Sequence, residues 1–123
     1  MQRIYQPDAW VVLRLVVRYG SSAPSNELRV LAGWRGGFLT ADCWRMNSGI
    51  DGVAFVDGSY LITSKSGSVY RCGLDDYGVS PIMVDGLHTI QSQPQVLSAD
   101  IVDDRDWADP GAVQVALGET SFS

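Results

Sequence analysis

Residues 10–19 alternate between two kinds of position in a run that is rich in β-branched and aromatic side chains. The odd-numbered positions are almost all apolar, whereas the even-numbered positions combine apolar residues with two arginines. This alternation predicts a strand whose odd face meets the core and whose even face is only half covered. Because a part-apolar sheet face is a common place for a two-fold contact, we expect the even face to contribute to a homo-oligomer. The residues of this candidate oligomer face are Trp10, Val12, Arg14, Val16 and Arg18.

Two further strands are predicted in the next part of the chain. The run 20–26, GSSAPSN, concentrates turn-forming residues and ends the first strand, and the next strand extends over residues 27–34. Gly36 and Gly37 follow this strand and can adopt the positive φ angles of a tight reversal. The third strand then covers residues 38–47.

The stretch of residues 52–72 gives the clearest prediction. Asp57-Gly58 lies between GVAFV and SYLIT, and Ser66-Gly67 lies between TSK and SVYRC. Both dipeptides are typical of tight hairpin turns, and the runs beside them are rich in strand-forming residues. We therefore expect three short antiparallel strands in a meander.

After the meander, the spacing of apolar residues becomes helical. Ser80 is a good N-cap, and Pro81 suits the first position of a helix. We expect a short helix over residues 81–92, although Gly86 in its interior costs roughly 1 kcal/mol relative to alanine. The apolar face of this helix consists of Met83, Leu87 and Ile90.

The remaining residues are acidic and have a less regular pattern. Residues 98–110 contain five aspartates and predict a loop, whereas residues 112–117, AVQVAL, are typical of an edge strand. Taken together, the patterns predict one α+β domain over residues 1–123 that is mainly antiparallel β. We expect a small β roll or barrel-like meander with one short helix, in which residues 93–123 form an acidic extension.

Composition is consistent with one soluble globular domain. The chain has 123 residues, of which 46% are hydrophobic and 19% are charged, and its mean hydropathy is +0.02. The longest apolar stretch, residues 9–17, is interrupted by Arg14 and is too short to cross a bilayer. No secretory leader is visible at the start, so we expect a cytoplasmic protein without membrane contact.

Charge is distributed unevenly along the chain. The net charge is −5, with +3 in residues 1–50 and −8 in residues 51–123. An acidic total argues against nucleic acid as a partner. This asymmetry has two interpretations. The two charges could form opposite faces that pair head to tail in an oligomer, or the acidic part could be a solvated tail.

Metal ligands are sparse in this sequence. It has two cysteines, Cys43 and Cys72, and one histidine, His88, and they form no CxxC or HxxxH spacing, so we predict no metal and no cofactor. We expect both cysteines to be reduced and buried in strands, with a disulfide as the alternative. The aspartates from Asp100 to Asp109 do not follow the spacing of a calcium-binding loop, which favours a solvated acidic loop.

No catalytic constellation is visible in the sequence. Nucleophilic catalysis requires a cysteine beside His88, and the other interpretation places His88 on the polar side of the short helix. Asp75 and Asp76 are adjacent and would point apart in a turn, so they do not form an acid and base pair. We expect no catalytic residues and treat a small enzyme with a pocket around His88 as an alternative.

Arginines and aromatic residues are the remaining candidates for a site. Eight of the nine basic residues are arginine, which forms two-point contacts with carboxylates and stacks on aromatic rings. The aromatic residues near them either belong to the core or line a small-molecule pocket or a protein interface. The candidates for such a pocket or interface are Trp34, Arg35, Trp44, Arg45, Tyr60, Tyr70, Arg71 and Tyr77.

Three motifs, GWRGG, CWRMNSGI and SKSGSVYRC, lie between Gly33 and Cys72 and are followed by Tyr77-Gly78. With these motifs the chain resembles small hypothetical proteins carried on mobile elements, notably those of integron gene cassettes. The resemblance covers about a third of the chain. It implies a compact, independently folding accessory protein and supplies no catalytic residues.

These observations predict an accessory, non-catalytic binding module. We expect it to act through an arginine and aromatic surface or pocket on a protein or a small molecule. Besides the small enzyme, the alternative is an acidic protein that blocks a nucleic-acid-binding partner, given the charge of −8 in residues 51–123.

Overall fold

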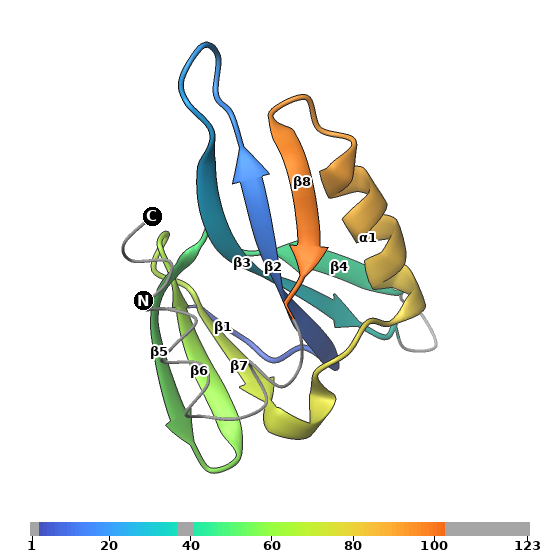
Figure 1. Cartoon of the computed structure of the whole chain (residues 1–123). Coiled ribbons are helices and arrows are strands. Elements are labelled where there is room, and N and C mark those ends of the chain that lie inside the picture. The colour runs from blue at the N-terminus through green and yellow to red at the C-terminus, as the bar shows by residue number, and fades with distance from the viewer. Residues whose placement is uncertain (1–2, 37–40, 103–123) are drawn as a thin grey trace.

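The computed structural model describes residues 3–36 and 41–102, which form two four-stranded sheets and one α-helix (Figure 1). Sheet A has the strand order β1-β7-β6-β5, and sheet B has the order β4-β3-β2-β8. The strand pairs are antiparallel except that β1 runs parallel to β7. In chain order the elements are β1 (Ile4–Tyr5), β2 (Ala9–Val17), β3 (Ser25–Trp34), β4 (Cys43–Met46), β5 (Ile50–Val56), β6 (Ser59–Ser64), β7 (Val69–Gly73), the 3-10 helix η1 (Leu74–Asp76), α1 (Pro81–Gln91) and β8 (Val96–Ile101).

The predicted α+β class, with mainly antiparallel strands and one short helix, is confirmed. The expected barrel-like closure does not occur in the described part of the chain, where the two sheets remain separate layers. Sheet A packs on one face of sheet B, and α1 covers the opposite face (Figure 1). The molecule therefore has two cores, one between the sheets and one beneath the helix.

Strand β2 separates the two cores because both of its faces are covered. Trp10 and Val12 point into the core between the sheets, whereas Val11, Leu13 and the following odd-numbered residues point into the core beneath α1. A strand that is covered on both faces has a nearly continuous apolar sequence. This double burial accounts for the run of apolar residues at the start of the predicted strand.

The expectation of a half-covered even face is wrong at the start of β2. Trp10 and Val12 are both 0% exposed because sheet A packs over this half of sheet B. These two residues therefore cannot contribute to an exposed oligomer face. Arg14 and Arg18 are exposed and Val16 is partly exposed, so three of the five residues predicted for that face remain accessible.

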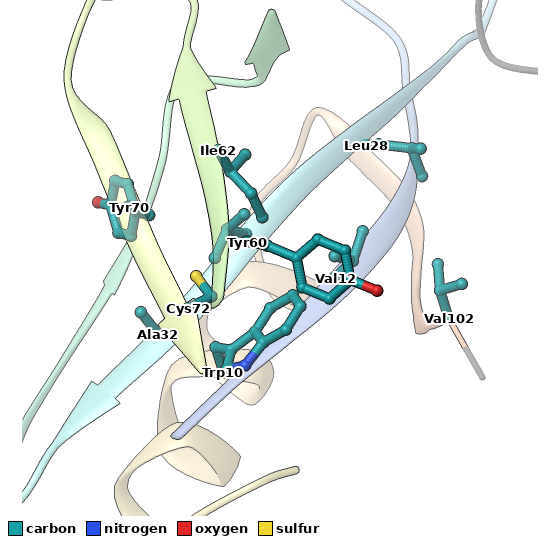
Figure 2. Close-up of a cluster of buried hydrophobic side chains, with 10 residues drawn as sticks. Trp10, Val12, Leu28, Ala32, Tyr60, Ile62, Tyr70, Cys72 and Val102 are labelled. Carbon is teal, nitrogen blue, oxygen red and sulfur yellow. The ribbon is translucent and has the colours of Figure 1, made fainter. Parts of the chain in front are cut away.

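The core between the sheets is dominated by large aromatic side chains (Figure 2). Trp10 from sheet B and Tyr60 from sheet A have ring centroids 5.7 Å apart, and Tyr70 is also buried in this core. The indole N–H of Trp10 donates a hydrogen bond to the carbonyl oxygen of Gly73 at 2.7 Å. The buried indole is therefore satisfied by the other sheet, which fixes how the two sheets pack together.

Helix α1 begins where the sequence predicts. Ser80 adopts the extended backbone of an N-cap residue, and Pro81 is the first helical residue. Met83 and Ile90 are buried against sheet B, as the helical spacing predicts. Gly86 is buried as well, and a Cβ atom at this position would lie 2.5 Å from Cδ2 of Trp44. The helix thus contains a glycine because the Trp44 indole packs directly against its backbone.

Both predicted hairpins are present in sheet A. Asp57 and Gly58 have φ angles of 51° and 76°, which a type I′ turn requires. Gly67 has a φ angle of 98° in the second turn. The side chains of β6 alternate between buried and partly exposed, so sheet A has one face on the core and one face outside.

Strand β8 corrects the prediction for the acidic region. The sequence predicts a loop from residue 98, but residues 98–101 belong to a strand that pairs antiparallel with β2. Pairing with an ordered neighbour and burial of Ala99 beneath α1 outweigh the preference of serine and aspartate for turns. Residues 112–117, the predicted edge strand, lie outside the described residues.

Strand β4 is shorter than the prediction of residues 38–47. It comprises Cys43–Met46 and pairs with the end of β3, and residues 38–40 of the predicted strand lie outside the described residues. Cys43 is exposed on this edge strand, so the expectation that it is buried is wrong, whereas Cys72 is buried as predicted. Both cysteines are free thiols, which excludes the alternative of a disulfide between them.

Candidate anion-binding site

The aromatic residues predicted for a site belong mainly to the two cores. Tyr60 and Tyr70 are buried between the sheets, and Trp34 and Tyr77 pack against that core. Trp44 packs in the other core, beneath α1. These five side chains therefore do not form one exposed aromatic surface.

Tyr77 has a structural role where β2 and the end of β8 meet. Its hydroxyl accepts a hydrogen bond from the backbone N–H of Val12 at 3.1 Å and donates one to the carbonyl oxygen of Val102 at 2.6 Å. Its ring meets Trp10 edge-on, with the centroids 4.7 Å apart. Tyr77 thus joins three segments of the fold.

The three predicted arginines lie in different places. Arg35 is exposed after β3, and its backbone N–H donates a hydrogen bond to Asp8 at 2.7 Å. Arg71 is exposed and lines a separate, mainly apolar pocket of about 540 Å³ on the outer face of sheet A. Arg45 projects from β4 and borders a cavity together with Tyr70. Of the predicted candidates, the structure brings only Arg45 and Tyr70 into this cavity.

This cavity, which we call the arginine pocket, has a volume of about 530 Å³. It lies where the two sheets meet, and it is formed by β1, β3, β4, β7 and the turns that precede β5 and β7. Among the described residues, no aspartate or glutamate lines it. Its polar and aromatic lining residues are Arg3, Arg29, Arg45, Asn47, Ser48, Ser66, Ser68, Tyr5 and Tyr70.

Two of the arginines are held at the same aromatic ring. The Arg45 guanidinium carbon lies 4.7 Å from the Tyr5 ring centroid, within cation–π range. Nη1 of Arg3 donates a hydrogen bond to the Tyr5 hydroxyl at 3.2 Å, and this bond raises the pKa of Arg3 above its ordinary value. In the described part of the chain, neither arginine has an ion pair with a carboxylate. Among the described residues, no carboxylate therefore neutralises either positive charge.

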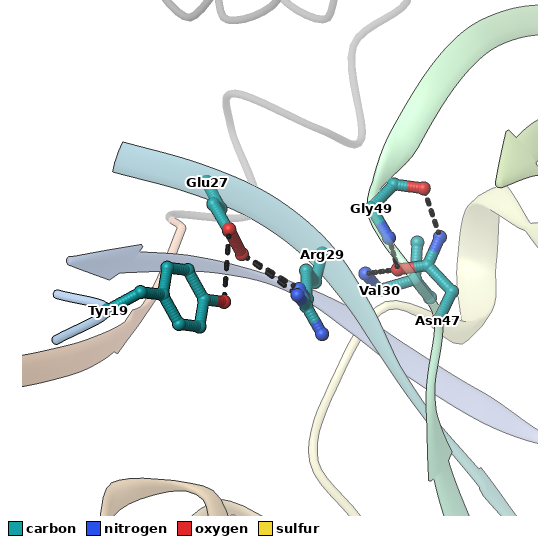
Figure 3. A network of polar contacts seen from close by, with 6 residues as sticks. All are labelled: Tyr19, Glu27, Arg29, Val30, Asn47 and Gly49. Carbon is teal, nitrogen blue, oxygen red and sulfur yellow. Dashed lines mark hydrogen bonds and ion pairs between the residues drawn. The ribbon is translucent and has the colours of Figure 1, made fainter. Parts of the chain in front are cut away.

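The third arginine of the pocket is already neutralised. Arg29 forms an ion pair with Glu27, with Nη2 and Oε1 2.9 Å apart, and its Nε donates a hydrogen bond to the same oxygen at 3.1 Å (Figure 3). The Tyr19 hydroxyl donates a longer hydrogen bond of 3.5 Å to the other carboxylate oxygen of Glu27. Arg29 thus lines the pocket, but its positive charge is neutralised by Glu27, which does not line the pocket.

Asn47 fixes the pocket wall between β4 and β5 (Figure 3). Its side-chain oxygen accepts a hydrogen bond from the backbone N–H of Val30 at 2.8 Å. Its amide nitrogen donates to the carbonyl oxygen of Gly49 and to the Ser64 hydroxyl, both at 3.2 Å. The amide therefore connects β3, β6 and the turn that precedes β5 in one network.

The two turns that form the pocket wall are also hydrogen-bonded to each other. The backbone N–H of Ser66 donates to the Ser48 hydroxyl at 2.9 Å, and that of Lys65 donates to the carbonyl oxygen of Gly49 at 3.0 Å. Gly49 has a φ angle of 122°, a conformation that favours glycine. These bonds preorganise the serine-rich side of the cavity.

Tyr70 forms part of the pocket with a neutral phenol. Burial raises its pKa to about 12, and the positive charge of Arg45 only partly opposes this effect. The phenol therefore stays protonated at neutral pH and adds no negative charge to the cavity.

The other chemical candidates are dispersed over the described residues. His88 is exposed on α1 and does not line the arginine pocket, as expected for the polar side of a short helix. Within residues 3–36 and 41–102, no group of three or more potential metal-ligating side chains is present. Of the aspartates between 100 and 109, only Asp100 is described, and it is exposed on β8.

The sequence interpretation missed most of the pocket. Arg3, Tyr5 and Arg29 were not among its candidates, and neither were the serines of the two turns. The one available signal was the clustering of serine and glycine in SGI and SKSGS, which shows two turns but does not show that they are neighbours. The pairing of β1 with β7 brings Tyr5 beside Tyr70, and this contact depends on tertiary structure.

No protein-family model, curated protein or solved structure matches this chain. The resemblance to cassette-encoded proteins therefore remains a prediction. Among the described residues, no helix has the length and hydropathy needed to traverse a bilayer.

Proposed function

We propose that this protein is a binding module that holds an anionic small molecule in the arginine pocket. One observation carries the proposal. Three arginines converge on a cavity of about 530 Å³ whose described lining contains no carboxylate, and two of them, Arg3 and Arg45, have no ion pair in the described part of the chain. Packing of the fold does not require two guanidinium groups at one ring that lack an ion pair among the described residues.

The physical chemistry of the pocket favours an anion. Guanidinium groups donate planar, charge-assisted hydrogen bonds to carboxylate and phosphate oxygens. Three serines, Ser48, Ser66 and Ser68, line the same space. The cavity volume of about 530 Å³ lies within the range of roughly 300–1,000 Å³ that is usual for small-molecule sites.

The test is thermal unfolding of the full chain in inorganic phosphate and in chloride at equal ionic strength. A ligand that binds the folded state raises the Tm as its concentration rises. We expect such a rise, and we expect Arg45→Gln to weaken binding about tenfold, because a hydrogen bond to a charged group contributes roughly 1.5–3 kcal/mol.

Arg71→Gln is the matched control because it removes the same charge from the outer face of sheet A, away from the pocket. We expect it to bind phosphate as the native protein does. Equal weakening in both variants would assign the effect to overall charge, and no specific rise of the Tm in phosphate would refute the proposal.

A further inference from the structure

Resting on the proposed function, we infer that the arginine pocket is selective for a phosphate monoester on a small polar molecule, and that Glu27 sets this selectivity by holding Arg29. The inference names the ligand class and assigns a role to a residue outside the lining of the pocket.

The charges of the pocket match a dianion. Arg29 is ion-paired with Glu27 at 2.9 Å, whereas Arg3 and Arg45 have no such pair among the described residues. A carboxylate matches only one of these two positive charges. A phosphate monoester carries roughly −1.5 to −2 at pH 7 and matches both.

The placement of the two guanidinium groups also favours one shared ligand. Arg45 lies over the Tyr5 ring at 4.7 Å, and Arg3 donates to the hydroxyl of that residue at 3.2 Å. Two cations held at one side chain repel each other, and an anion that contacts both removes this repulsion. Phosphate offers three terminal oxygens, enough for both planar donors.

The space that remains beside a bound phosphate group indicates what kind of molecule carries this phosphate. A cavity of about 530 Å³ is much larger than one phosphate group. Ser48, Ser66 and Ser68 line this cavity, and serine hydroxyl groups can form hydrogen bonds with a hydroxylated molecule. Sugar phosphates and nucleoside monophosphates share this chemistry, and the experiment distinguishes them.

Glu27 competes with the ligand for Arg29. Its Oε1 engages both Nε and Nη2 of Arg29, at 3.1 and 2.9 Å, and Tyr19 holds the other carboxylate oxygen at 3.5 Å (Figure 3). This fixed carboxylate keeps a third positive charge from the ligand. A more highly charged anion such as pyrophosphate therefore gains little from Arg29 in the native protein.

The first test compares glycerol 3-phosphate with glycerate by titration calorimetry on the full chain at pH 7.5. We expect the phosphate to bind at least about tenfold more tightly, because it engages one more arginine. This advantage should shrink as the pH falls through about 6, where the monoester takes up a proton. Equal affinities would overturn the inference and leave the proposed function standing, whereas no binding of either compound or of inorganic phosphate would overturn both.

Ribose 5-phosphate and adenosine 5′-monophosphate then identify the source of the phosphate. Tighter binding of either compound than of glycerol 3-phosphate supports the inference and shows which body the pocket accepts. Free ribose is the control, and binding of ribose as tight as that of ribose 5-phosphate would contradict a phosphate-directed site.

The second test uses Glu27→Gln, which releases Arg29. We expect its affinity for pyrophosphate to rise about tenfold, since Arg29 becomes a third charged donor. Asp85→Asn makes the same change of charge on the exposed face of α1 and should give no rise. No gain in Glu27→Gln, or the same gain in both variants, would exclude the role of Glu27. If Glu27→Gln does not fold, Tyr19→Phe loosens Glu27 through one hydrogen bond, and the same direction of change is required.

Discussion

Asn47 connects the stability of the fold to the shape of the pocket. It is 3% exposed, and its amide is hydrogen-bonded to Val30, Gly49 and Ser64. A buried amide with this many partners fixes local geometry because every alternative arrangement leaves a polar group unsatisfied. Asn47 thus contributes to the pocket wall and to the stability of the fold through the same hydrogen bonds.

We predict that Asn47→Ala lowers the free energy of unfolding by roughly 2–4 kcal/mol, because the buried N–H of Val30 and the Ser64 hydroxyl lose a partner. Urea denaturation measures this loss. Asn26→Ala, at an exposed position of β3, is the control and should change stability by less than about 0.5 kcal/mol. Similar losses in both variants would contradict the role of the Asn47 network.

At the residue scale, the sequence predicted residue types for a candidate site but not which of these residues lie together. Arginine and aromatic residues were recognised as the candidates, and Arg45 and Tyr70 do line the pocket. Arg3 and Arg29 escaped notice because each is an ordinary surface arginine until distant strands bring it beside a serine-rich turn. The ion pair that neutralises Arg29 decides the charge of the site, and no spacing rule distinguishes it from other arginine and glutamate neighbours.

At the element scale, Gly86 illustrates a conflict between local propensity and packing. We predict that Gly86→Ala lowers the free energy of unfolding by roughly 1–3 kcal/mol although alanine is the better helix former, because its Cβ would lie 2.5 Å from Trp44. Thermal and urea denaturation measure the change. Gly78→Ala, where no atom lies within 4 Å of the added Cβ, should be nearly neutral.

A double variant tests the cause of this effect. In a Trp44→Ala background the space beside the helix is free, so Gly86→Ala should become neutral or stabilising. If the loss of stability is the same in both backgrounds, the Trp44 contact is not its cause.

Elements with local signals were predicted well, and those that depend on distant partners were not. The turn at Asp57-Gly58 and the N-cap at Ser80 are determined by the conformational preferences of the residues themselves. Strand β1 is two residues long and exists because β7 is beside it. Strand β8 contains serine and aspartate and is stabilised by β2.

At the scale of the whole molecule, β2 is a structural part of both cores. Loss of this strand removes the layer between sheet A and α1, so neither core can persist alone. We therefore expect the described fold to unfold as one cooperative unit. The sequence did not show this, because the periodicity of a strand reveals its two faces but not which elements cover them.

Thiol labelling measures this cooperativity. In a Cys43→Ser variant, the remaining Cys72 is 0% exposed, and burial raises the pKa of its thiol. We predict that Cys72 reacts with a disulfide reagent only through global unfolding, so that the free energy of opening equals that from urea denaturation. An opening energy lower by more than about 1 kcal/mol would show that sheet A separates first. In the native protein, the exposed Cys43 should react at once.

The parallel pairing of β1 with β7 places Tyr5 beside Tyr70 in the wall of the arginine pocket. Tyr5 belongs to the two-residue strand β1, and Arg3 immediately precedes this strand. Neither side chain is part of the fully buried core. Replacement of Arg3 and Tyr5 would remove two lining residues from the arginine pocket and leave the buried residues of both cores in place. If the proposed anion binding holds, substitutions in this short segment should change ligand affinity more than they change the stability of the fold.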